Sequence, residues 1–265
     1  MKKILISLIF AAQAVFGESQ PHSVATEGKG AAPTDGYTPP IIGNGSICTS
    51  VDYLGGQTQR KYVNYFPEVV WAGRRTNLPF TSLSTMGHFE CEISVDGAPL
   101  GEPISWRQTL NTTEAYTECE VEYASATVKT VAFVPYGYDM LVVEKTVAPK
   151  SGSAKTADVK FKYKFTDKDS TYPPARTIMR QQQYEAQPNS ASLFYTIFGH
   201  KNYNGEISAT SSAPAKVSTN NTSITLESHF DLSKGGASSA YFVTYADDFN
   251  KGNREKNSAA LKKYF

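Results

Sequence analysis

The sequence predicts an all-β protein, folded as a large antiparallel two-sheet sandwich with a short helix beginning at its C-terminus. The first observation is strict alternation of apolar and polar residues, clearest in residues 88–95 and 159–165. Strand side chains repeat every two residues, so alternation indicates one buried and one solvated face. The second is a tight-turn pair, Asp96-Gly97, of the kind that joins antiparallel strands. The third is composition, because 12% aromatic and only 19% charged residues suit strands better than solvated helices.

In the first half of the chain, alternation and β-branched runs place the strands. Within residues 118–123, for example, Cys119, Val121 and Tyr123 point inward and three glutamates point outward. Turn-forming Gly and Pro residues close most of these stretches. The strands expected here cover residues 46–54, 88–95, 118–123, 127–134 and 141–147.

The second half contains further strands and one long expected loop. In residues 159–165 the rings of Phe161 and Tyr163 must face a core, whereas three lysines face water and protect the strand against aggregation. Residues 171–188 carry Tyr-Pro-Pro and Gln-Gln-Gln and are expected to form a surface loop. The other expected strands cover residues 193–199, 205–210, 223–230 and 240–245. So many strands separated by turns imply two stacked sheets.

The N-terminus has the features of a signal peptide over residues 1–17. Two lysines precede a short apolar core that ends in small residues. The apolar run is too short to cross a membrane, so no membrane span is expected. A buried core helix is the alternative interpretation. A signal peptide predicts a secreted or periplasmic protein. Residues 18–38, rich in Gly, Pro, Ser and Thr, would then form a flexible lead-in.

The sandwich is expected over residues 39–249, and its alternation stops there. Residues 250–265 are rich in Lys, Ala and Asn and indicate the start of a helical linker. Its only large apolar residues, Leu261, Tyr264 and Phe265, lie at the very end. A helix this short is marginal in water unless it packs on something, so we expect this helix to be poorly held.

Charge and cysteine content narrow the class of function. With a net charge of +1, the chain has no strong positive charge that would attract nucleic acid. The three cysteines, Cys48, Cys91 and Cys119, allow at most one internal disulfide, and three buried thiols are the preferred interpretation. Their spacing does not suit zinc, so no metal site is expected. No phosphate loop or dinucleotide fingerprint occurs, so no cofactor is expected.

Several stretches taken together resemble a known family. Gly43-Asn44-Gly45 within residues 40–47 is similar to the opening of secreted glycosidases and glycoside phosphorylases of the six-hairpin, or (α/α)6-barrel, group. The middle of the chain is also similar to that group in the order of its stretches, which are residues 104–110, 118–123, 128–134 and 139–144. The resemblance covers roughly residues 38–250. It implies an N-terminal β-supersandwich domain without the catalytic barrel that follows it in that group.

The same resemblance implies that this chain lacks the catalytic residues, because the family's general acid lies in the barrel. Glycoside hydrolysis needs a pair of carboxyl groups, and sequence places no such pair here. The loop acids Asp52, Glu68, Glu114 and Asp139 are expected to be solvated surface groups. No catalytic residue is therefore assigned, and whether the chain is an enzyme stays open.

Carbohydrate contact is the remaining expectation. Sugars stack on aromatic rings, and Arg and Asn side chains offer fixed donors to hydroxyl groups. The candidate carbohydrate-binding residues are Trp71, Arg74, Arg75, Trp106 and Asn44. The alternative for both tryptophans is a place in the core, since large aromatic residues dominate cores.

The functional hypothesis is a non-catalytic β-sandwich domain of a secreted glycoside hydrolase-like protein. It would brace an (α/α)6 barrel encoded downstream and complete its sugar site. Two alternatives remain open, a free-standing carbohydrate-binding module and a structural surface module. The sequence does not identify the sugar or the linkage.

Overall fold

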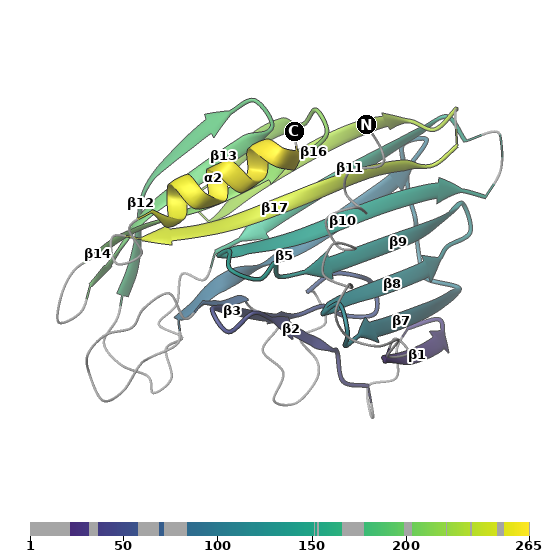
Figure 1. Cartoon of the computed structure of the whole chain (residues 1–265). Helices are drawn as coiled ribbons and strands as arrows, with labels where there is room; N and C mark the ends of the chain where they lie inside the picture. Colours follow the sequence, from purple (N-terminus) through teal and green to yellow (C-terminus); the bar gives the residue numbers. More distant parts are fainter. Residues whose placement is uncertain are drawn as a thin grey trace.

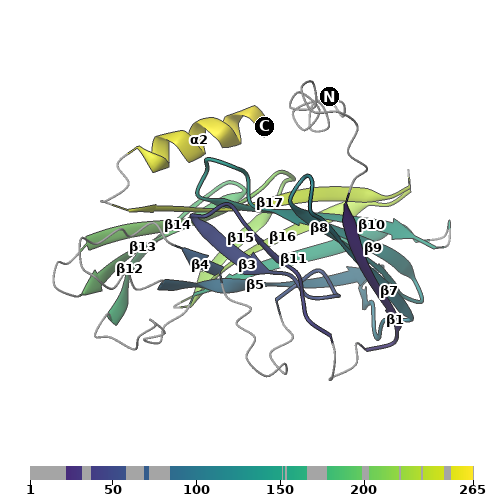
Figure 2. The same ribbon diagram turned by 60° about the horizontal axis from the view of Figure 1, so that its bottom comes forward.

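Two antiparallel sheets stack face to face, which confirms the all-β sandwich (Figures 1 and 2). The computed structural model describes residues 22–31, 37–57, 69–71, 84–150, 152, 154–165, 178–198, 203–220, 222–233, 235–247 and 252–264. Within these residues, no helix combines the length and the hydrophobicity that a membrane crossing needs. The signal peptide expected over residues 1–17 lies outside them.

The larger sheet has nine strands. In spatial order these are β1 (Ser23–Lys29), β7 (Ser105–Asn111), β8 (Tyr116–Glu122), β9 (Ala126–Phe133), β10 (Met140–Pro149), β17 (Ala237–Asp247), β14 (Tyr203–Ser211), β13 (Ser190–Phe198) and β12 (Ile178–Gln187). The chain runs through β7 to β10 as a meander and returns much later as β17. Strands from distant parts of the sequence therefore meet in the middle of this sheet (Figure 1).

The smaller sheet has eight strands. In spatial order these are β15 (Lys216–Asn220), β16 (Ser223–Asp231), β11 (Thr156–Lys164), β5 (Ser84–Val95), β4 (Val69–Trp71), β3 (Ile47–Ser50) and β2 (Ile41–Gly43), with β6 (Ala98–Pro99) also paired to β5. The expected turn joins β5 to β6, and both Asp96 and Gly97 have positive φ, at 50° and 77°.

A stack of aromatic rings joins the two sheets. Phe161 of β11 is fully buried, as the alternation of residues 159–165 predicts. Its ring centroid lies 5.5 Å from that of Phe89 in β5 and 4.5 Å from that of Tyr241 in the opposite sheet. Stacked pairs of this kind add about 0.5–1.5 kcal/mol each beyond the burial of their area. The core is therefore centred on β11 and β17.

Seven strands lie outside the ranges that the sequence predicts as strands, namely β1, β2, β4, β6, β7, β12 and β15. β12 occupies much of the expected loop 171–188. The sequence does not predict this strand because its exposed positions Gln183, Glu185 and Gln187 make the stretch look uniformly polar. β1 lies inside the lead-in expected over residues 18–38. Almost all of its side chains are exposed, so backbone pairing with β7 holds it. β15 is likewise an exposed edge strand.

An irregular segment, residues 51–57, is buried between the two sheets. Gln108 Nε2 on β7 donates to the carbonyl oxygen of Val51 at 2.9 Å. Lys145 Nζ on β10 donates to the carbonyl oxygen of Gly55 at 2.7 Å. From the smaller sheet, the backbone N–H of Phe89 donates to Gln57 Oε1 at 2.8 Å. Because buried polar groups need partners, these bonds stabilise a loop in the interior.

The C-terminal helix α2 (Asn253–Tyr264) lies on the outer face of the larger sheet, along β17 (Figures 1 and 2). The sequence predicts a poorly held helix, but two small residues anchor it. Ala260 is buried against outward side chains of β10 and β17. Asn257 is also buried, and its Nδ2 donates to the carbonyl oxygens of Asp139 and Tyr245, both at 3.2 Å.

Candidate functional site

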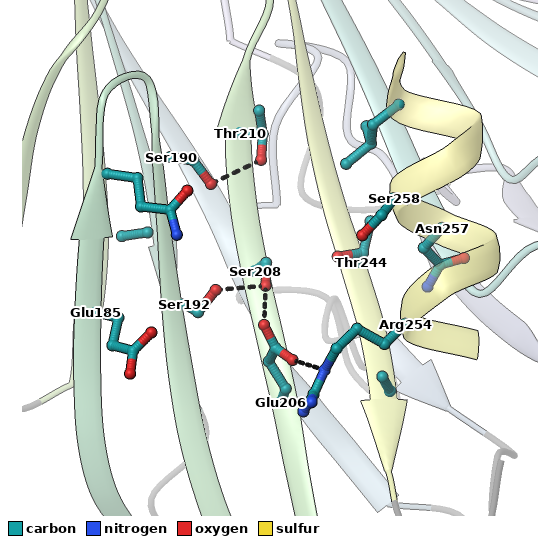
Figure 3. A pocket seen from close by; sticks show the side chains of 14 residues that line it. Glu185, Ser190, Ser192, Glu206, Ser208, Thr210, Thr244, Arg254, Asn257 and Ser258 are labelled. Carbon is teal, nitrogen blue, oxygen red and sulfur yellow. Dashed lines mark hydrogen bonds and ion pairs between the residues drawn. The ribbon is translucent and has the colours of Figure 1, made fainter. Parts of the chain in front are cut away.

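A polar groove lies beside α2, over the strands at one end of the larger sheet (Figure 3). Four outward positions of β13 and β14 carry small hydroxyl side chains, so the floor of the groove is low there: Ser190, Ser192, Ser208 and Thr210. The strand register brings these side chains into rows that cross the sheet. One row contains Glu185, Ser192, Ser208 and Thr244, and the next contains Gln187, Ser190 and Thr210.

The wall of the groove comes from α2. The helix covers the apolar outward residues of β10 and β17, such as Val142 and Phe242. Arg254 and Ser258 face the groove from the helix, opposite Glu185 on β12 (Figure 3). The volume of the groove is about 210 Å³. The groove therefore marks the boundary between the apolar and polar halves of this outer face.

A chain of polar contacts runs across the groove from β13 to α2. The hydroxyl oxygens of Ser192 and Ser208 lie 2.7 Å apart, and Ser208 Oγ donates to Glu206 Oε1 at 2.9 Å. The other carboxylate oxygen, Glu206 Oε2, forms an ion pair with Arg254 Nε. Glu206 is mostly buried, with 12% of its side chain exposed, whereas Arg254 is 61% exposed. Arg254 also lies over the ring of Phe194, 5.9 Å from its centroid.

These groups can bind a ligand through hydrogen bonds. Hydroxyl groups both donate and accept, carboxylates only accept, and guanidinium only donates. Large apolar side chains contribute little to the part of the lining that the structure describes, where the apolar residues are Ala191, Ala246 and Leu261. Within the described ranges, no group of His, Cys, Asp and Glu is suited to hold a metal ion.

The side chain of Asn44, which the sequence predicts as a sugar ligand, forms its hydrogen bonds with other parts of the protein. Its Nδ2 donates to the carbonyl oxygens of Pro135 at 2.8 Å and Tyr138 at 2.9 Å. Its Oδ1 accepts from the backbone N–H groups of Ser46 at 2.9 Å and Ile47 at 3.0 Å. Asn44 thus joins the β2–β3 turn to the β9–β10 turn and does not line the groove.

Trp106 lies in the core, the alternative that the sequence leaves open. Only 3% of it is exposed, and Tyr37 and Tyr53 pack against its ring. Gly28 of β1 covers the indole so closely that a Cβ there would lie 2.6 Å from Trp106 Cζ2. The indole N–H is buried and has no hydrogen-bond partner in the described part of the chain. The same edge of the sheet has an open depression of about 650 Å³, and its lining includes Trp106, Gly28 and Arg107.

The remaining sugar-binding candidates are not brought together with these two. Trp71 belongs to β4, and its side chain lies outside the described residues. Arg74 and Arg75 also lie outside them. Nothing in the structure therefore tests the cluster that these three residues would form.

Two of the loop acids have structural partners and are not simple surface groups. Asp52 is fully buried, and its Oδ1 accepts from the backbone N–H groups of Leu54 and Gly56. The Asp139 carboxylate accepts hydrogen bonds from Ser46 and from the α2 residue Asn253. Glu68 lies outside the described residues. Both carboxylates stabilise turns.

The three cysteines are free thiols, so no disulfide forms among them. Cys119 is buried as expected, and burial raises the pKa of its thiol to about 12. Cys48 is exposed on β3, contrary to the expectation of three buried thiols. Cys48 points outward from β3, between the buried residues Ile47 and Thr49, which explains the difference.

Comparison with known proteins supports the fold. No protein-family model matches the chain, and no curated protein matches its sequence. Among solved structures, a protein described as a kojibiose phosphorylase from the human microbiome is 12% identical, with a TM-score of 0.57. The match covers 84% of this chain and 32% of that chain, so this chain spans about a third of that protein's length.

A protein described as an aldose 1-epimerase from Escherichia coli K12 is 11% identical, with a TM-score of 0.37, over 79% of this chain and 99% of that chain. At these identities, the first likeness establishes a shared fold, and the second is too distant to support an inference.

Proposed function

We propose that this chain is a non-catalytic β-sandwich domain of a secreted carbohydrate-active protein, which braces an (α/α)6 barrel and completes its sugar site. The observation that carries the proposal is the shared fold with one third of a protein described as a kojibiose phosphorylase. The sandwich accounts for most of this chain, which leaves the remaining two thirds of that protein without a counterpart here.

The turn that contains Asn44 supports the same proposal. The Gly-Asn-Gly stretch carries the resemblance to six-hairpin glycosidases, and its asparagine fixes two turns from different sheets. The N-terminus of α2 joins the same place through the contact between Asn253 and Asp139. This end of the sandwich is therefore held rigid, as a surface that supports a second domain needs to be.

Secretion is part of the proposal and rests on the sequence of residues 1–17. Cleavage after Ala14 or Gly17 would release the mature chain. N-terminal sequencing of the protein recovered outside the cytoplasm tests it. An uncleaved Met1 in that material would contradict it.

The functional test is an activity assay in two parts. The purified full chain is incubated with aryl glycosides, and with kojibiose and inorganic phosphate, and released sugar or sugar phosphate is measured. We expect no turnover. The DNA that flanks the gene is then sequenced for a helical-barrel reading frame, and that barrel is assayed with and without this chain. Turnover by this chain alone, lost in Glu114→Gln, would overturn the proposal. A barrel equally active without the chain would overturn the bracing role.

A free-standing carbohydrate-binding module is the second candidate. The groove beside α2 favours it, because its polar lining is open to solvent in the isolated chain. Full sugar binding by the chain in the absence of any barrel would favour this candidate.

A further inference from the structure

We propose that the groove beside α2 is a binding site for one residue of a neutral sugar, recognised through its hydroxyl groups. The ligand class rests on the proposed carbohydrate-related function, whereas the location rests on the geometry of the groove. Asn44 and Trp106, the two predicted sugar ligands whose side chains the structure describes, do not line this groove.

Size limits the ligand to a single small ring. Drug-sized ligands occupy pockets of roughly 300–1,000 Å³. The groove offers about 210 Å³ and is partly open. A single sugar residue, either free or at the end of a longer chain, fits this space, and the rest of an oligosaccharide would extend into solvent.

The lining favours a neutral ligand with several hydroxyl groups. Ser190, Ser192 and Thr210 on the floor can each donate and accept, as a sugar hydroxyl does. Two carboxylates, Glu185 and Glu206, face one guanidinium in the groove. This balance is acidic, so it disfavours phosphate, sulfate and acidic sugars. Among the described residues that line the groove, none is aromatic, so hydrogen bonds and not stacking would supply the specificity.

The polar groups of the groove are held in place before a ligand arrives. Ser192, Ser208 and Glu206 form a continuous hydrogen-bonded chain on two rigid strands. The ion pair between Glu206 and Arg254 joins that chain to the helix wall. Binding sites on rigid strands lose less conformational entropy when they bind, so a fixed array of this kind favours affinity for a small ligand.

The test is a titration of the isotope-labelled full chain, followed by NMR chemical shifts of backbone amides. The probes are glucose, galactose, mannose, xylose and fucose, with glucuronate as the anionic counterpart of glucose. We expect saturable shifts at the amides of residues 190–192 and 206–210 with at least one neutral sugar. We expect glucuronate to bind more weakly than glucose if glucose is a ligand.

Two variants locate the site. Thr210→Val removes one floor hydroxyl with little change in shape and should weaken binding about five- to tenfold. Ser208→Phe fills the groove and should abolish binding. The matched control is Thr225→Val, the same change on the outer face of the opposite sheet, which should bind like the parent. Far-ultraviolet circular dichroism confirms that each variant is folded.

The outcomes separate this inference from the proposed function. If none of the five neutral sugars binds, the groove is not a sugar site. If a sugar binds but Thr210→Val and Ser208→Phe leave its affinity unchanged, the groove inference is also wrong, although a carbohydrate-related function stands. Preferred binding of glucuronate would overturn the charge argument and with it the ligand class. Failure of the barrel assay alone leaves the groove result intact.

Discussion

Replacement of Asn44 by alanine tests whether this residue supports the fold or binds sugar. The substitution removes four hydrogen bonds, two donated to the carbonyl oxygens of Pro135 and Tyr138 and two accepted from the backbone of the following turn. At a net 0.5–1.5 kcal/mol per bond, the total is about 2–6 kcal/mol. Asn44 is half-buried, and water can replace part of the loss, so we expect about 2–3 kcal/mol.

Urea unfolding measures this loss. With an m-value of about 3 kcal/mol/M, the upper part of the range for small proteins, the midpoint should fall by about 0.7–1 M. Asn44→Asp keeps the acceptor for the turn but places an oxygen against the two carbonyl oxygens. It should therefore destabilise as well. The matched control is Asn220→Ala, since Asn220 caps an exposed turn and its Oδ1 accepts hydrogen bonds from Thr222 and Ser223, two and three residues along the chain.

Two results would refute the reasoning. One is a midpoint for Asn44→Ala no lower than that of Asn220→Ala, because the contacts between the two turns would then contribute nothing. The other is a variant of unchanged stability that has lost sugar binding. That result would return Asn44 to the role of a sugar ligand.

Three further predictions concern the core, an edge strand and acid stability. Phe161→Ala should lower the free energy of unfolding by about 3–5 kcal/mol, because the ring of Phe161 is fully buried. The control Lys162→Ala should lower it by no more than about 0.5 kcal/mol. Equal urea midpoints for the two variants would contradict the strand assignment. Gly28→Ala should detach β1 and shift the emission of Trp106 to longer wavelength, whereas unchanged emission would contradict the close contact. Two backbone N–H donors at 2.9 Å hold the pKa of Asp96 below its ordinary 3.8. The contribution of the Asp96 carboxylate to the free energy of unfolding should therefore be present above pH 3.8 and disappear as pH falls through the lower pKa of the folded state. Urea unfolding at a series of pH values should show this loss in the parent protein and not in Asp96→Asn.

The fold could be predicted where side chains alternate without interruption. Residues 159–165 and 118–123 are examples, because one face of each strand packs on the core and the other meets water. Alternation failed for β12, whose described outward positions are polar and whose sequence includes three successive glutamines. It also failed for β1, which buries almost nothing and depends on backbone pairing that no side-chain pattern records.

The candidate site could not be predicted, because its members are ordinary serines and threonines on separate strands. Alternation shows that Ser192 and Ser208 point outward, but only the register brings them within 2.7 Å of each other. The ion pair between Glu206 and Arg254 joins residues from the strand region and the terminal helix. Sequence reasoning instead favoured tryptophan and asparagine, residue types that serve packing and turns here as readily as they serve sugar binding.

The buried segment of residues 51–57 has a consequence for amide hydrogen exchange. Its N–H groups bond within the segment, as Asp52 N–H does to the Gly56 carbonyl at 2.8 Å and Gly55 N–H does to the Asp52 carbonyl at 2.9 Å. The segment also lies between the sheets, so solvent reaches these N–H groups only when the sheets separate. An irregular loop should thus exchange as slowly as the central strands β11 and β17, while the regular strand β1 at the sheet edge should exchange early. We therefore expect backbone protection in this protein to follow depth between the sheets and not the presence of regular secondary structure.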